Sequence, residues 1–187
     1  MKNFIKIEDK TISFGDCKNC DAYCCKGSYG SIFSQILKDE FEELYPNFPI
    51  LFIFGSLGFV KPIILLSDGF NSCPYLKNSS CSIYINRPNV CKNYPLSPNI
   101  DNEVYIDNSC PEVFKKGKLL DIKSELFSNY QEKYIETHLE FENLANEDFK
   151  LVCTIKNEKF YKYIGKNSSK YLKYHKLSLS NLDKIFV

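Results

Sequence analysis

The cysteines limit what this chain can fold into more than any other feature of its sequence. Nine of the 187 residues are Cys, and eight of them fall into two groups. The first group is Cys17, Cys20, Cys24 and Cys25, and the second is Cys73, Cys81, Cys91 and Cys110. The N-terminal segment has neither a continuous apolar stretch nor a small-residue cleavage site, so no secretory signal is predicted. We therefore expect a cytoplasmic protein with reduced thiols, in which clustered cysteines bind metal or take part in redox chemistry.

The spacing of the first group suits metal ligands. Cys17 and Cys20 form a C-x2-C pair, and a tight turn brings two such sulfurs to one point. If the segment is helical, Cys20 and Cys24 share a face, whereas Cys25 lies about 100° further round. We therefore predict that Cys24 and Cys25 serve two metals, or two irons of one cluster, rather than a single ion.

The second group lies in turn-rich sequence, where four prolines restrict the backbone around the sulfurs. Eight clustered thiols fit two four-thiolate zinc sites. They also fit one iron–sulfur cluster, such as a [4Fe–4S] cluster on four thiolates, with four cysteines in another role. The sequence leaves zinc and iron open because thiolates suit both metals, and it does not assign which sulfurs share a metal.

Charged and aromatic residues next to these cysteines are candidates for the surroundings of the metal. A divalent ion on four thiolates leaves a charge of about −2, which a nearby cation would offset. Arg87, fixed by the following proline, and Lys92 are the candidate cations, while Tyr84 and Tyr94 are expected to cover the sulfurs. The alternatives are a surface salt bridge for Arg87 and ordinary core packing for the two tyrosines.

The order of these motifs resembles a known family. The segments CxxCxxxCC, CPxL, CxIYxxRPxxCxxYP and a later CP are similar to the YkgJ-type cysteine-cluster family, which is described as a zinc- or iron-chelating domain. The resemblance covers roughly Cys17 to Val113 and implies metal binding by the eight cysteines. Lys92 and Tyr94 stand where that family usually has Arg and Phe. A related cluster occurs in enzymes that methylate lysines of flagellin, but no Gly-rich nucleotide loop is recognisable here, so a complete methyltransferase is not predicted.

The rest of the sequence predicts an α+β fold. Apolar residues make up 44% and charged residues 25%, which are ordinary values for a globular chain and exclude a wholly disordered one. We expect a small cysteine-rich, metal-centred domain with short strands over residues 1–117. A long helix and a basic C-terminal arm over residues 118–187 are expected to pack on it as one unit.

Hydrophobic patterns place the individual elements. Residues 48–66 are apolar enough to suggest a membrane span, but a lysine, two prolines and two glycines interrupt them. We therefore predict two buried strands around a turn, and no membrane association. Residues 104–106 indicate another short strand. Apolar residues recur every three or four positions over 119–146, which predicts one long helix. Residues 151–155 and 159–164 predict a hairpin.

A shorter helix is predicted over residues 35–45, where apolar side chains share one broad face. The acidic pairs Asp39-Glu40 and Glu42-Glu43 within it are interpreted as a solvated helix face rather than an acid/base site.

Residues 150–187 carry nine lysines and two acidic residues, a net charge of +7, with tyrosines interleaved. Such a strip can hold a polyanion such as RNA. The candidate residues are Lys159, Lys162, Lys166, Lys170 and Lys173. We favour a solvated face that packs against the acidic remainder of the chain, because Lys without Arg reads base edges poorly. Cys153 is predicted to be a small buried hydrophobe, and neither His138 nor His175 is predicted to bind a metal.

The leading functional hypothesis is a cytosolic metal-binding protein whose clustered cysteines chelate zinc or an iron–sulfur cluster. One alternative is an iron–sulfur component of an enzyme system, for redox chemistry or protein-lysine methylation, working with an unidentified protein partner. Others are a metal-stabilised nucleic-acid-binding module and a thiol redox sensor that uses Cys24 and Cys25. The sequence shows no nucleophile–His–acid arrangement, so it leaves open whether the chain is an enzyme, and it names no substrate.

Overall fold

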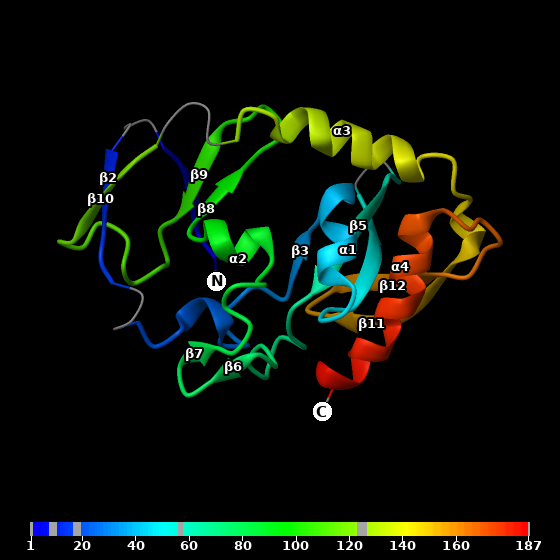
Figure 1. Cartoon of the computed structure of the whole chain (residues 1–187), viewed down its shortest axis with the longest axis horizontal. Coiled ribbons are helices and arrows are strands. Elements are labelled where there is room, and N and C mark those ends of the chain that lie inside the picture. The colour runs from blue at the N-terminus through cyan, green and yellow to red at the C-terminus, as the bar shows by residue number, and fades with distance from the viewer. Residues whose placement is uncertain (1, 8–10, 17–19, 56–57, 123–126, 187) are drawn as a thin grey trace.

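A computed structural model describes residues 2–7, 11–16, 20–55, 58–122 and 127–186 (Figure 1). Over these residues the chain is a mixed α/β structure whose strands pair antiparallel, which confirms the expected α+β class. No helix in these ranges has the length and apolar character needed to cross a membrane. Cys17 lies outside the described residues.

The strands are β1 (Phe4–Lys6), β2 (Thr11–Phe14), β3 (Phe33–Gln35), β4 (Ile50–Phe54), β5 (Val60–Leu65), β6 (Leu76–Lys77), β7 (Ser80–Cys81), β8 (Leu96–Pro98), β9 (Val104–Asp107), β10 (Lys118–Asp121), β11 (Phe149–Ile155) and β12 (Glu158–Tyr163). The α-helices are α1 (Phe41–Leu44), α2 (Asn89–Asn93), α3 (Tyr130–Phe141) and α4 (Lys170–Ser178). Short 3-10 turns are η2 (Tyr23–Cys25), η3 (Lys38–Glu40), η4 (Asn146–Asp148) and η5 (Leu179–Lys184).

The largest sheet has five strands in the order β11-β12-β4-β5-β3. The hairpin of β4 and β5 confirms the two buried strands predicted over residues 48–66, and Gly58 in their connection has a φ of +78°, which favours glycine. The hairpin of β11 and β12 is also confirmed. Its turn residues Lys156 and Asn157 both have positive φ, the geometry that matches the twist of the flanking strands.

Apolar cores lie on both faces of this sheet because neighbouring residues of a strand point to opposite sides. Phe52, in the middle of β4, is fully buried, and its ring lies 5.4 Å from Phe141 of α3 and 5.3 Å from Phe149. Helices α1 and α4 complete this core. Leu51 and Phe160 belong to a second core on the other face.

A smaller body lies at the opposite end of the molecule, with α3 along the edge between them (Figure 1). It consists of the three-stranded sheet β1-β9-β8 and the pair β2-β10. Its buried residues are Ile12, Ile106, Cys110, Val113 and Ile122. Strand β9 confirms the strand predicted over residues 104–106.

The long helix predicted over residues 119–146 is wrong in its first part. Residues 118–121 form β10, whose Leu120 is paired with Ile12 of β2, and α3 occupies only Tyr130–Phe141. A short apolar run fits a strand as well as a helix, and the partner strand, far away in the sequence, decides between them. Residues 123–126 lie outside the described part of the chain.

The helix predicted over residues 35–45 is shorter than expected. Gln35 ends β3, where it is paired with Ile63, and the helical part is only η3 followed by the single turn α1. The acidic pairs do not form one solvated face, because Glu40 is only 8% exposed while Asp39, Glu42 and Glu43 are exposed.

The basic C-terminal arm contains an ordered helix, α4, with a side-chain cap. The Ser169 hydroxyl accepts a hydrogen bond from the Leu172 backbone N–H at 3.4 Å, which satisfies one of the unpaired donors of the first turn. We expect Ser169→Ala to lower the free energy of unfolding by about 1 kcal/mol, measured by urea denaturation. Ser168→Ala, one residue earlier and exposed, is the control, and equal losses in both variants would contradict the capping role.

Candidate metal centre

The fold brings the cysteine-bearing segments of both groups together. Cys24 and Cys25 lie in η2, and the Cys73 backbone N–H donates a hydrogen bond to the Cys25 carbonyl oxygen at 2.8 Å. Cys81 ends the two-residue strand β7 opposite Leu76 of β6. Figure 1 shows α2, which carries Cys91, on the same side of the molecule as β6 and β7.

The ionisation of two of these thiols, Cys73 and Cys91, is affected by other cysteines of both groups. Burial, together with the neighbouring thiols of Cys73, Cys24 and Cys81, raises the pKa of the Cys91 thiol to about 12. Burial also raises the pKa of Cys73, and Cys81 and Cys24 again add to the effect. Like-charge effects of this kind need nearby groups, and the Cys73–Cys25 backbone hydrogen bond and the β6–β7 pairing also bring these segments together, so we group Cys24, Cys73, Cys81 and Cys91. We call this group the four-thiol cluster.

A second pair of thiols lies beside this cluster. Cys110 is 7% exposed, and its pKa is raised by burial, with Cys20 among the groups that raise it. Tyr94 links the two sets, because burial raises the pKa of its hydroxyl and both Cys110 and Cys24 contribute in the same direction. The remaining cysteine of the first group, Cys17, lies outside the described residues.

The vicinal pair Cys24 and Cys25 has a geometry that the sequence did not predict. The segment is a 3-10 turn rather than an α-helix, and the two sulfurs are 3.8 Å apart. That separation is far longer than a disulfide bond of about 2.05 Å. It matches the distance of about 3.8 Å between two thiolates on one tetrahedral zinc with Zn–S bonds of about 2.3 Å. The argument that these sulfurs diverge rested on an α-helix, so it does not apply here.

The thiols of the four-thiol cluster lie near one another, but their sulfurs do not form a finished metal site. Within the described ranges, no three Cys, His, Asp or Glu side chains are arranged tightly enough to hold a metal ion. Metal ligation by these sulfurs would therefore require the side chains or loops to draw closer together.

Arg87 is one of the cations near the thiols. Its positive charge lowers the pKa of Cys91 against the stronger effect of burial. The guanidinium carbon lies 3.8 Å from the ring centroid of Tyr84, whereas the buried Nε has no hydrogen-bond partner among the described residues. A buried donor without an acceptor costs free energy, and thiolate sulfurs are acceptors that would satisfy it.

The other residues predicted around the metal have different partners. The Lys92 ammonium is 3.4 Å from the Glu43 carboxylate, so it is directed toward α1. The Tyr94 hydroxyl donates to Asp107 at 3.0 Å, and Tyr84 is 60% exposed beneath Arg87. Arg87 and Tyr94 therefore adjoin the sulfurs, while Lys92 pairs with an exposed acid.

Asp107 is an organising residue that sequence reasoning missed. It is fully buried, and although burial raises its pKa, hydrogen bonds from Ser109, Asn3 and Lys2 outweigh this and lower the pKa to about 2. Its backbone carbonyl also accepts from the Cys110 N–H at 3.0 Å, so it fixes the loop that carries this thiol. The sequence Asp-x-Ser at 107–109, typical of a side-chain-capped turn, was the signal for it.

The remaining predicted residues lie away from the thiols. Cys153 is on β11 and packs against the second core of the large sheet, and burial raises its pKa. The five candidate lysines are spread over β12, the following loop and α4. His175 is fully buried, and the His138 ring lies 4.7 Å from that of Phe59.

Comparison with protein-family models, with curated proteins and with solved structures returned no match.

Proposed function

We propose that this chain binds metal through its clustered cysteines, with zinc or an iron–sulfur cluster as the bound species. The observation that carries the proposal is the four-thiol cluster, whose sulfurs come from η2, the loop before β6, β7 and α2. Zinc at this position would join these segments by thiolate bonds, and an iron–sulfur cluster would add electron transfer.

The local structure around the cluster supports this proposal. Between Ser67 and Tyr94 the regular structure consists of two strands of two residues and a five-residue helix, and Cys73 and Tyr75 touch the main core only from its margin. Small segments with so little apolar burial usually depend on a disulfide or a metal for their stability. The unpartnered Nε of Arg87 gives the same indication, because bound thiolates would accept from it.

Cys25, which lies next to the four-thiol cluster, supports zinc in particular, because its sulfur is 3.8 Å from that of Cys24, the edge length of a tetrahedral thiolate site. A four-thiolate zinc site has no open position for substrate, so a zinc-bound chain would use the metal for structure. Metal binding must displace the thiol protons, and we expect affinity to fall as the pH is lowered.

Elemental analysis of anaerobically purified, untagged protein tests the proposal. We expect about one or two Zn per chain, or about four Fe for a cubane cluster. Cys91→Ser should remove at least half of this metal, because Cys91 belongs to the four-thiol cluster. Cys153→Ser, in the core of the large sheet, is the matched control and should keep the full content.

Two results would overturn the proposal. The first is a protein with a negligible content of either metal after anaerobic purification. The second is an equal metal content in the wild type, Cys91→Ser and a combined Cys73→Ser and Cys91→Ser variant. Reversible oxidation of the Cys24 and Cys25 pair in metal-free wild-type protein would then favour a thiol sensor.

A further inference from the structure

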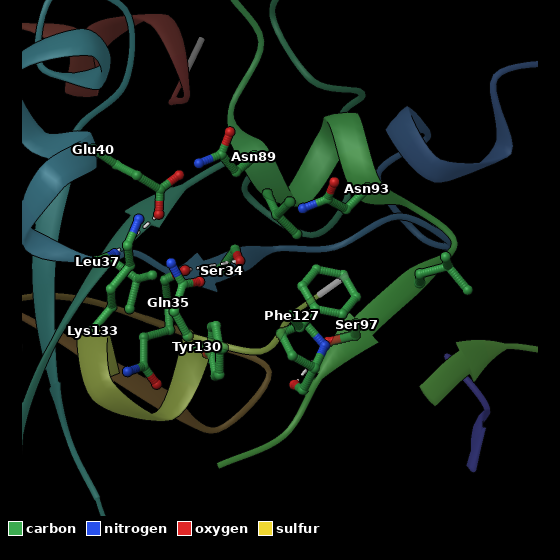
Figure 2. Close-up of a pocket in the computed structure, with 14 residues that line it drawn as sticks. Ser34, Gln35, Leu37, Glu40, Asn89, Asn93, Ser97, Phe127, Tyr130 and Lys133 are labelled. Carbon is green, nitrogen blue, oxygen red and sulfur yellow. Dashed lines mark hydrogen bonds between the residues drawn. The ribbon is translucent and has the colours of Figure 1, made fainter. Parts of the chain in front are cut away.

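A pocket of about 310 Å³ lies between the two bodies of the fold, outside the thiol cluster. It is bounded by β3 of the large sheet and the adjoining η3, by α2, by β8 of the smaller body, and by the start of α3. Figure 2 shows Glu40 and Asn89 along one side of this space and Tyr130 and Phe127 along the other. The volume is at the small end of the range for ligand pockets, about 300–1,000 Å³.

Glu40 is the residue that gives the pocket its chemistry. It is 8% exposed, and its carboxylate accepts a hydrogen bond from the Leu37 backbone N–H at 3.0 Å. Burial raises its pKa, while the backbone amides of Leu37 and Asn89 act in the opposite direction and favour the charged form. The fold therefore holds an acidic group in a confined, partly apolar space.

No ion pair in the described part of the chain neutralises Glu40. Lys133 also lines the pocket, and the hydrogen bond to Asp39, helped by the Glu40 charge, raises its pKa, but its ammonium forms its ion pair with the exposed Asp39 carboxylate, at 2.7 Å. A buried carboxylate with no cation in direct contact is costly, so a cationic ligand that contacts Glu40 would gain a strong interaction there.

The other walls define the shape and polarity of a ligand. Phe127 is 9% exposed, and both it and Tyr130 line the pocket. Asn89 and Asn93 of α2 add side-chain amides, which offer both donors and acceptors. Flat aromatic walls on one side and a carboxylate on the other suit a planar cation.

We propose that this pocket binds a small planar organic cation, such as an amidinium, a guanidinium or a protonated amino-heterocycle, with the Glu40 carboxylate as its counter-ion. The cation lies against Tyr130 and Phe127 and donates hydrogen bonds to Glu40. An anion is disfavoured because the same carboxylate would repel it. This site is separate from the proposed metal function and does not require it.

Three probes of nearly equal shape and different charge test the proposal on the full-length protein. They are benzamidine, which is a cation, benzamide, which is neutral, and benzoate, which is an anion. Ligand-observed NMR titration should give the tightest dissociation constant for benzamidine. We expect Glu40→Gln to weaken benzamidine by about fivefold, the difference between a charge-assisted and a neutral hydrogen bond, and to change benzamide by less than twofold.

Two further variants keep the test decisive. Ser97→Phe fills the pocket from β8 while leaving Glu40 in place, so it should abolish binding of benzamidine even if Glu40→Gln does not fold. Glu147→Gln, an exposed acid in η4, should bind like the wild type. The proposal is overturned if benzamidine does not bind at millimolar concentration, if benzamide or benzoate binds as tightly, or if Ser97→Phe has no effect.

Discussion

Replacing Phe52 with Ala should lower the free energy of unfolding by about 3–5 kcal/mol. Phe52 is fully buried in the central strand β4. Its ring contacts those of Phe141, Phe149 and His175, with centroid distances of 5.4, 5.3 and 4.9 Å. These neighbours come from α3, β11 and α4, so loss of the ring leaves a cavity where these three elements meet β4.

Urea denaturation of the wild type and Phe52→Ala measures this change through the shift in Cm at constant m. Phe70→Ala is the control, because Phe70 is 82% exposed and its truncation should change the free energy of unfolding by no more than about 0.5 kcal/mol. A loss smaller than 1 kcal/mol in Phe52→Ala would show that this core is loosely packed, contrary to the structure.

The second large effect is a loss of stability on acidification that is caused by His175. This imidazole is fully buried, and its Nε2 accepts a hydrogen bond from the Tyr163 backbone N–H at 3.1 Å. Nε2 must therefore be unprotonated, and Nδ1–H donates to the Ile50 carbonyl oxygen at 2.7 Å. Burial lowers the pKa of His175 to about 4 from its usual 6.5, although the hydrogen bond to the Ile50 carbonyl acts in the opposite direction.

The sign of the effect follows from these pKa values. Between pH 6.5 and pH 4 the unfolded chain binds a proton at this position and the folded chain does not, so acidification favours unfolding. The expected loss between pH 7 and pH 5 is about 2 kcal/mol. Asp107, with a pKa of about 2, titrates below this range, and Glu40, whose pKa is raised by burial, acts in the opposite direction.

Urea unfolding at several pH values, compared with His175→Gln, isolates this contribution. His175→Gln should be less stable at pH 7 but should lose less stability than the wild type as the pH falls to 5. His138→Gln, at a partly exposed position of α3, should keep the pH dependence of the wild type. Parallel curves for the wild type and His175→Gln would contradict a buried neutral imidazole.

The elements that the sequence predicted correctly are those with local partners. The β4–β5 and β11–β12 hairpins each pair with the next strand in the sequence, so composition and turn residues are enough to place them. Strand β10 was mistaken for helix because its partner, β2, is far away in the sequence. For the same reason the sequence does not predict the burial of Glu40: α2 and α3, which line the pocket beside it, are distant from it in the sequence.

The candidate site was likewise predictable from the sequence only in part. Residue types and spacing identified the cysteines as the centre of the chemistry, but spacing did not show that Cys24 groups with Cys73, Cys81 and Cys91. That grouping depends on the path of the chain through η2, β6–β7 and α2. The buried carboxylate of Asp107 and the pocket beside Glu40 also arise only when segments distant in sequence meet.

The strand order of the large sheet has a consequence for the newly made chain. During synthesis β3, β4 and β5 can pair with one another as soon as they emerge, but the other edge of β4 must wait for β12. Until then an apolar strand, Ile50–Phe54, keeps an open edge of backbone donors and acceptors, which is a template for aggregation. All eight clustered thiols precede β12 in the sequence, so they have been translated before the strand that closes the sheet.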